Sequence, residues 1–189
     1  MFSFSRLVGA DPMLGVEMAS TGEVGCFGDD INEALLHALL ATGFRFPKKG
    51  VLLSLGPLQD KYWFADEARV ISEHLKLPIY ATPGTAEALR AIGIPCTSLA
   101  KQPDEGETAM GAIDEGRVDL VINVPREYDH LGRPDGYLIR RRAVDAGIPL
   151  LTDLQLARAV IEAMRSRRIE DLRTLAYDEY LARSPVALR

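Results

Sequence analysis

The sequence predicts an α/β protein built on a five-stranded parallel sheet with helices on both faces. From about Val51 onward, short apolar runs of β type alternate with stretches of helical period. Three of the helical stretches are followed by a glycine (Gly93, Gly116 and Gly147), the residue favoured in the left-handed conformation after a helix. Continuous apolar strands joined by helical crossovers form parallel sheets, because both faces of such strands are buried.

Each expected element follows from its local pattern. The strands, as continuous apolar runs, are expected at residues 51–55, 78–81, 96–99, 119–124 and 148–151. The crossover and following helices are expected near residues 61–75, 85–92, 108–115, 137–146 and 153–165.

Two further helical segments flank this region. Residues 31–42 place several leucines on one side; Asp29 or Asp30 can cap the start, and Gly43 ends the helix. We expect the leucine side to pack on the sheet-containing domain of the same chain, the alternative being an apolar surface meant for another domain. Residues 169–180 alternate acids and bases and are expected to form a terminal helix or tail.

The composition limits the classes of function. With 189 residues and 47% hydrophobic content, the chain can bury a core of ordinary size. Cys26 and Cys96 are far apart, so neither a disulfide framework nor a metal site is indicated. The net charge of -5 argues against nucleic-acid binding. No apolar run reaches the roughly 18 residues of a membrane span, and no signal peptide is evident, so we expect a cytoplasmic protein without membrane partners.

The segment Ala81-Thr82-Pro83-Gly84-Thr85 carries the strongest chemical signal. It joins an expected strand to an expected helix, and so presents two hydroxyls, backbone N–H groups and a positive helix end at one point. Such a combination suits a phosphate group. Threonine and glycine at a helix start are also ordinary capping residues, so the segment needs support from elsewhere in the chain.

That support comes from other polar residues at strand ends. In an open parallel sheet, ligands bind beyond the carboxyl ends of the strands. An alternative is that each of these polar side chains is merely a solvated loop residue. Their convergence on one edge favours an anion site, for which the candidate residues are Ser54, Lys61, Thr82, Thr85, Lys101 and Asn123.

Nearly the whole chain resembles the C-terminal end of the large subunit of carbamoyl-phosphate synthetase. Residues 17–24 (Glu-Met-Ala-Ser-Thr-Gly-Glu-Val) resemble the last stretch of the second ATP-grasp unit in that family. Residues 81–85, 120–123, 139–143 and 143–152 resemble hallmarks of its methylglyoxal synthase-like domain. The resemblance implies a tail of the ATP-grasp domain over residues 1–28, a connecting helix and linker over 29–47, the methylglyoxal synthase-like allosteric domain over 48–167, and a C-terminal tail over 168–189.

The resemblance implies a regulatory domain that makes no product. In that family the domain binds UMP or IMP, UTP or phosphoribosyl pyrophosphate, or N-acetylglutamate. Carried over to this chain, Lys61, Thr82 and Thr85 would hold a phosphate, and Lys101, Asn123 and Ser54 would complete the site. No cofactor is expected in this chain, whereas the parent enzyme, an ATP-dependent ligase, would use ATP with Mg or Mn. The expected partners are the phosphorylated effector, the remaining synthetase domains and a glutaminase subunit or domain.

Departures from the family patterns narrow the choice of effector. The N-acetylglutamate type has tryptophan where this chain has Lys101, and asparagines at the equivalents of Arg126 and Gly136. These differences favour a phosphorylated effector. Val124-Pro125 replaces a threonine pair of the bacterial nucleotide type, which leaves the base or ribose contacts open. Leu151 replaces an aspartate of the ornithine site, so ornithine activation is not expected.

Three alternatives remain open. A lyase of the methylglyoxal synthase type, acting on dihydroxyacetone phosphate, needs a carboxylate base and a histidine beside the phosphate, but Leu55-Gly56-Pro57-Leu58 stands where that family has His-Asp. Substitutes for the missing groups would be Asp60, Glu127, Asp129 and His130. A cyclohydrolase-type relative shares Ser54, Asp60 and Lys61. A pure interaction module would use the leucines of residues 31–42.

Overall fold

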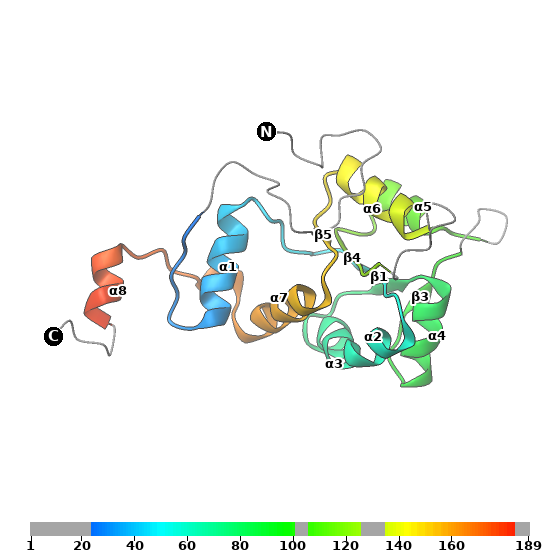
Figure 1. The fold of residues 1–189 in the computed structure, drawn as a ribbon, viewed down its shortest axis with the longest axis horizontal. Coiled ribbons are helices and arrows are strands. Elements are labelled where there is room, and N and C mark those ends of the chain that lie inside the picture. The colour runs from blue at the N-terminus through cyan, green and yellow to red at the C-terminus, as the bar shows by residue number, and fades with distance from the viewer. Residues whose placement is uncertain (1–23, 101–105, 126–134, 184–189) are drawn as a thin grey trace.

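The structure, a computed structural model, describes residues 24–100, 106–125 and 135–183. Its centre is a five-stranded, all-parallel sheet with the strand order β3-β2-β1-β4-β5 (Figure 1). The predicted fold class is therefore confirmed. The strands are β1 (Val51–Ser54), β2 (Ile79–Ala81), β3 (Thr97–Ser98), β4 (Leu120–Asn123) and β5 (Leu150–Leu151).

Alternating side chains of the central strands build a core on each face of the sheet. Val51 and Leu53 of β1 belong to one apolar cluster, whereas Leu52 belongs to the other. The first cluster is covered by α3 (Ala65–Arg69), α4 (Pro83–Ala91) and α7 (Leu154–Ser166). The second is covered by α5 (Ala109–Asp114) and α6 (Asp135–Asp145). Helices on both faces explain why the strands are apolar without alternation.

The helix expected over residues 61–75 is divided in the structure. It consists of α2 (Leu58–Trp63), α3 and a π-helical turn, η2 (Val70–His74). The division falls at Phe64, whose side chain is fully buried in the first cluster. Periodicity alone does not reveal such a break, because Phe64 is an apolar residue that fits the helical pattern.

Helix α1 (Ile31–Ala41) lies against α7, as the leucine pattern predicted (Figure 1). Leu36 is fully buried, and Leu35 and Leu39 pack against the first cluster. The helix start resembles a capping box shifted by one residue: the Asp30 carboxylate accepts from the Glu33 N–H at 2.9 Å, and the Glu33 carboxylate accepts from the N–H of Asp29, the residue before the N-cap, at 2.9 Å.

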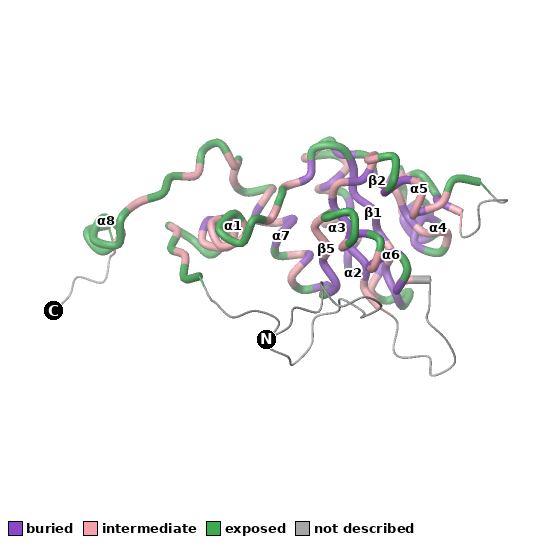
Figure 2. Tube along the Cα trace, turned by 90° about the horizontal axis from the view of Figure 1, so that it is seen from above, coloured by how far each residue is buried: buried purple, intermediate pink, exposed green. Residues whose placement is uncertain are grey.

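The C-terminal part differs from the single terminal element expected over residues 169–180. A short 3-10 turn, η4 (Ile169–Asp171), is followed by an extended segment and by α8 (Tyr177–Arg183). Helix α8 has no buried residue and stands away from the sheet (Figures 1 and 2). It contacts the segment before α1, where the Phe27 ring lies 5.5 Å from that of Tyr177 and 5.7 Å from that of Tyr180.

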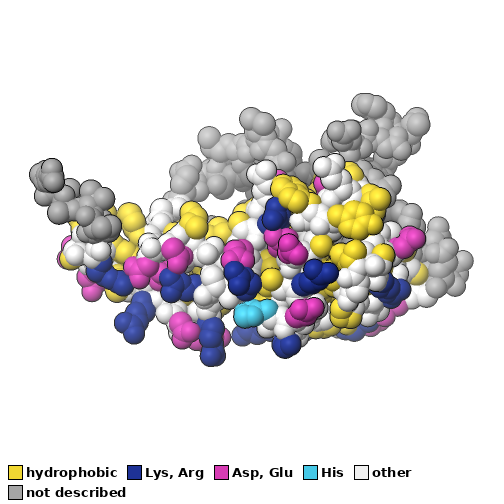
Figure 3. Space-filling model, turned by 90° about the horizontal axis from the view of Figure 1, so that it is seen from below, with side chains coloured by type: hydrophobic (Ala, Val, Ile, Leu, Met, Phe, Trp, Pro, Cys, Tyr) yellow, Lys and Arg dark blue, Asp and Glu magenta, His cyan; other side chains and the backbone are white. Residues whose placement is uncertain are grey.

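The surface mixes charges of both signs. On the face shown in Figure 3, acidic side chains lie among lysines and arginines. Charged side chains of the described residues form ion pairs, including Arg167 with Asp30 at 2.7 Å and Arg165 with Glu162. None of the helices in the described part of the chain combines the length and apolar character that a membrane crossing requires.

Candidate functional site

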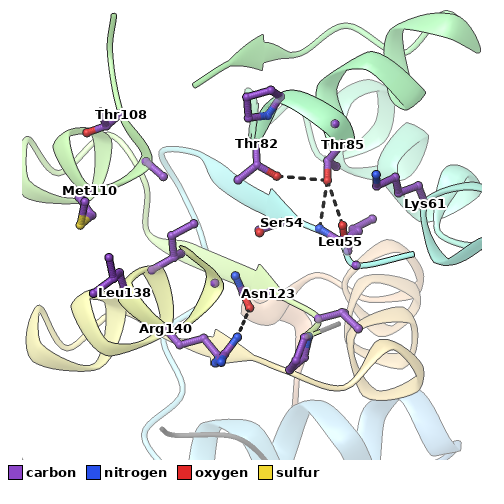
Figure 4. A pocket seen from close by; sticks show the side chains of 18 of the residues that line it. Ser54, Leu55, Lys61, Thr82, Thr85, Thr108, Met110, Asn123, Leu138 and Arg140 are labelled. Carbon is purple, nitrogen blue, oxygen red and sulfur yellow. Dashed lines mark hydrogen bonds between the residues drawn. The ribbon is translucent and has the colours of Figure 1, made fainter. Parts of the chain in front are cut away.

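The carboxyl ends of β1, β2 and β4 open into one cavity of about 340 Å³ (Figure 4). The parallel register explains the convergence, since Ser54 at the end of β1 pairs with Asn123 at the end of β4. Of the predicted site residues, the structure places five in the cavity lining: Ser54, Lys61, Thr82, Thr85 and Asn123. The sixth, Lys101, lies outside the described residues, and its role stays a prediction.

One end of the cavity is positively charged. Lys61 on α2 is only 7% exposed, and its Nζ would lie 3.3 Å from a Cβ atom built on Gly84. The ammonium group therefore lies against the first turn of α4, which begins at Pro83 after Thr82. A lysine charge and the positive end of a helix reinforce each other at this point. Both attract an anion and neither offers an acceptor for a cation.

The two threonines differ in their roles. Thr85 is 1% exposed, and its Oγ1 accepts from the Leu55 N–H at 3.1 Å and donates to the Leu55 carbonyl at 3.4 Å. The Thr82 hydroxyl donates to Thr85 Oγ1 at 3.3 Å. Thr85 thus fastens the end of β1 to the first turn of α4. Thr82 is half-buried at the cavity wall, so its hydroxyl is the more available of the two for a ligand.

The opposite end of the cavity contains a buried pair from β4 and α6. The Arg140 guanidinium donates to Asn123 Oδ1 at 2.7 Å, and the two residues are 2% and 1% exposed. Asn123 Nδ2 is buried and has no hydrogen-bond partner among the described residues. A Cβ on Gly136 would lie 3.0 Å from Arg140 Nη1 and 3.3 Å from Asn123 Oδ1, so the absent side chain leaves room for the pair.

Sequence reasoning missed Arg140 as a site residue. The signal available was a run of three arginines on the helix after the fourth strand. Only one of them reaches the cavity: Arg141 pairs with Asp145 on its own helix, and Arg142 pairs with Asp114 of α5. Which arginine turns inward depends on which side of α6 faces β4, and this is set by the packing of the helix on the sheet.

The remaining wall of the cavity is largely apolar. Leu138, Met110, Val124 and Pro125 line it, and Leu138 is 47% exposed. Asp, Glu and His are absent from the described lining residues, and Asp60 is not part of that lining. The other acid–base candidates, Glu127, Asp129 and His130, lie outside the described residues. The described cavity can therefore bind an anion with an attached organic group, and it offers no carboxylate base.

The fold agrees with that of a known class of domain, which part of the chain matches. Residues 67–152 match the family model described as the MGS-like domain, which agrees with the five-stranded parallel sheet and its helices.

The relatives are larger proteins, and the resemblance to carbamoyl-phosphate synthetase is confirmed. The chain is 40% identical, over 96% of its length, to the human mitochondrial "Carbamoyl-phosphate synthase [ammonia]", of which it covers 12%. It is 42% identical, over 86% of its length, to the "Multifunctional protein ura1" of Schizosaccharomyces pombe, of which it covers 8%. It is 41% identical, over 99% of its length, to the "Multifunctional protein pyr-3" of Neurospora crassa, of which it covers 10%. The chain thus spans about a tenth of these relatives.

Proposed function

We propose that this chain is the effector-binding regulatory domain of a carbamoyl-phosphate synthase, and that it binds a phosphorylated small molecule such as UMP or IMP. The observation that carries the proposal is the buried Lys61 ammonium at the first turn of α4. A buried lysine charge at a helix N-terminus is stabilised by an anionic partner. The similarity to carbamoyl-phosphate synthase and to multifunctional pyrimidine proteins supplies the biological setting.

The shape of the cavity supports a ligand with two unlike parts. Its volume of about 340 Å³ lies at the lower end of the usual range for small-molecule sites. In the proposed complex, Lys61, Thr82 and the start of α4 hold the phosphate. Asn123 at the opposite end receives the organic part, and the apolar wall around Leu138 covers it. Lys101 is proposed to complete the site.

The proposed mechanism of regulation is a population shift. A ligand in this cavity contacts β1, β2, β4 and α2 together, so it stabilises the arrangement in which these elements are closest. Regulation of a synthase then requires that the ligand-stabilised arrangement of this domain interact with the catalytic domains more strongly or more weakly than the ligand-free arrangement does. Four further statements are proposals for the parent protein and rest on the resemblance. They are an ATP-dependent ligase activity with Mg or Mn, a glutaminase partner, a role in pyrimidine and arginine biosynthesis, and a cytoplasmic location.

Calorimetric titration of the chain with UMP, IMP, inorganic phosphate and N-acetylglutamate tests this proposal. We expect saturable binding of a phosphorylated compound and a loss of at least tenfold in its affinity for Lys61→Met. Lys48→Met, at the opposite edge of the sheet, is the matched control and should bind as the unchanged chain does. Binding of N-acetylglutamate alone, or phosphate binding that is unchanged in Lys61→Met, would contradict the proposal.

A lyase is not proposed, because the described cavity lacks the carboxylate and imidazole groups that elimination of phosphate requires. Incubation of the chain with dihydroxyacetone phosphate should yield no methylglyoxal above the uncatalysed rate. Catalysed formation of methylglyoxal would overturn this conclusion.

A further inference from the structure

We infer that Arg140 is a positioning residue that holds the Asn123 amide with its nitrogen toward the cavity, and that this end of the cavity therefore selects ligands by a hydrogen-bond acceptor. The inference deepens the proposed function and rests on it for the identity of the ligand site. It names the chemistry of the second contact, a carbonyl or similar oxygen on the organic part of the ligand.

The direction of the Asn123 amide follows from the chemistry of its neighbour. A guanidinium group has only N–H donors and no acceptor. The amide atom that lies 2.7 Å from Arg140 Nη1 must therefore be the oxygen, Oδ1. The NH2 group is consequently on the other side, away from Arg140, as Figure 4 shows. An amide between neutral groups could turn over, whereas this one is held by a charge-assisted bond.

The surroundings make this arrangement rigid. Arg140 and Asn123 are among the buried polar residues of the chain, and both lie against the backbone of Gly136 at the start of α6. A buried N–H group without a partner is unfavourable, and an acceptor that approaches it recovers the loss. Asn123 Nδ2 is buried and lacks a partner among the described residues, and Asn123 belongs to the cavity lining. The unsatisfied donor is thus an independent sign of a ligand at this end.

The selectivity that follows can be measured with pairs of nucleotides. UMP and CMP share the phosphate and ribose but differ along one edge of the base: UMP has a carbonyl oxygen next to a ring N–H, whereas CMP has an amino group next to an unprotonated ring nitrogen. IMP and AMP differ in the same way. An amino group directed at Asn123 Nδ2 would place donor against donor. We expect the carbonyl member of a pair to bind about tenfold more tightly, the usual effect of one unsatisfied buried group.

Substitution of Arg140 tests whether this residue sets the preference. Arg140→Gln offers both a donor and an acceptor, so the Asn123 amide can turn over and the UMP/CMP and IMP/AMP ratios should fall to near one. Arg140→Lys keeps a group that only donates and should restore most of the preference. Arg141→Gln is the matched control, because Arg141 pairs with Asp145 on the outside of the same helix. The affinity for inorganic phosphate, which occupies only the Lys61 end, should be the same in all four proteins.

A second measurement needs no ligand. The Asn123→Asp substitution places a carboxylate beside the guanidinium, which compensates its charge. In the double variant Asn123→Asp/Arg140→Gln, the carboxylate is buried without a neighbouring positive charge to compensate it. A double-mutant cycle in urea unfolding should therefore give a coupling of at least tenfold in the unfolding equilibrium constant.

The outcomes distinguish the inference from the proposed function. Additive effects in the cycle, or nucleotide ratios unchanged in Arg140→Gln, would overturn the inference about Arg140. A Lys61→Met variant that binds phosphate normally would contradict the proposed function alone, and the unfolding cycle would still decide the role of Arg140.

Discussion

Replacement of Thr85 by valine isolates the bond that joins β1 to α4. Valine has nearly the shape of threonine, so no cavity forms, but the hydroxyl is lost. The Leu55 N–H then has no acceptor in place of Thr85 Oγ1, at present 3.1 Å away, and Leu55 is 4% exposed. An unsatisfied buried donor costs about 1–3 kcal/mol. The Thr82 hydroxyl also loses its partner, but it is half-buried and can bond to water.

We therefore expect Thr85→Val to lower the free energy of unfolding by about 2 kcal/mol, or roughly 30-fold in the unfolding equilibrium constant. Urea unfolding measures this loss, and the slope with urea should not change, because the surface exposed on unfolding is the same. Amide hydrogen exchange locates the effect. Protection of the Leu55 N–H should fall in Thr85→Val and persist in Thr85→Ser, which retains the hydroxyl.

Two results would refute this reasoning. One is a Thr85→Val protein within about 0.5 kcal/mol of the unchanged chain, the range of an ordinary surface substitution. The other is equal protection of the Leu55 amide in the valine and serine variants. Either would mean that the Thr85 hydroxyl is not the acceptor for Leu55 in solution, and that it remains available to a ligand.

Three further substitutions have defined outcomes. In Gly84→Ala the new Cβ would lie 3.3 Å from Lys61 Nζ, so the ammonium group should move aside. Calorimetry should then show weaker phosphate binding, whereas thermal unfolding should show no loss of stability. Asp30→Ala should cost about 1 kcal/mol at pH 7 by loss of the helix cap. Hydrogen bonds from the Glu33 N–H and a neighbouring arginine hold the pKa of Asp30 below its ordinary value of 3.8. The stability that the Asp30 carboxylate contributes is therefore fully present above pH 3.8 and is lost as the pH falls through the lowered pKa. Urea unfolding at several pH values should show the stability difference between Asp30→Ala and the unchanged chain vanish over that range. In Gly50→Ala the Cβ would lie 2.7 Å from a backbone carbonyl oxygen, and the free energy of unfolding from urea titration should fall by about 1–3 kcal/mol through overpacking; an unchanged value would contradict it.

Much of the candidate site could be predicted because it depends on strand ends. Apolar runs identify the strands, and parallel pairing brings their carboxyl ends to one edge. Ser54, Thr82 and Asn123 could therefore be assigned to a common edge without knowledge of any contact, and the cavity lining includes all three. Lys61 followed from its place one short loop beyond the first strand.

The sequence by itself determined the fold class, the edge of the sheet that carries the cavity and five of the polar residues that line it, since these depend on local periodicity and on the order of elements. Tertiary structure alone decided which arginine of the run on α6 turns inward, that the Thr85 hydroxyl bonds to Leu55, and that the second helical segment bends at Phe64. These features depend on how each helix is rotated against the sheet and on which buried groups meet across it. Such contacts join residues far apart in the chain, and no local pattern records them.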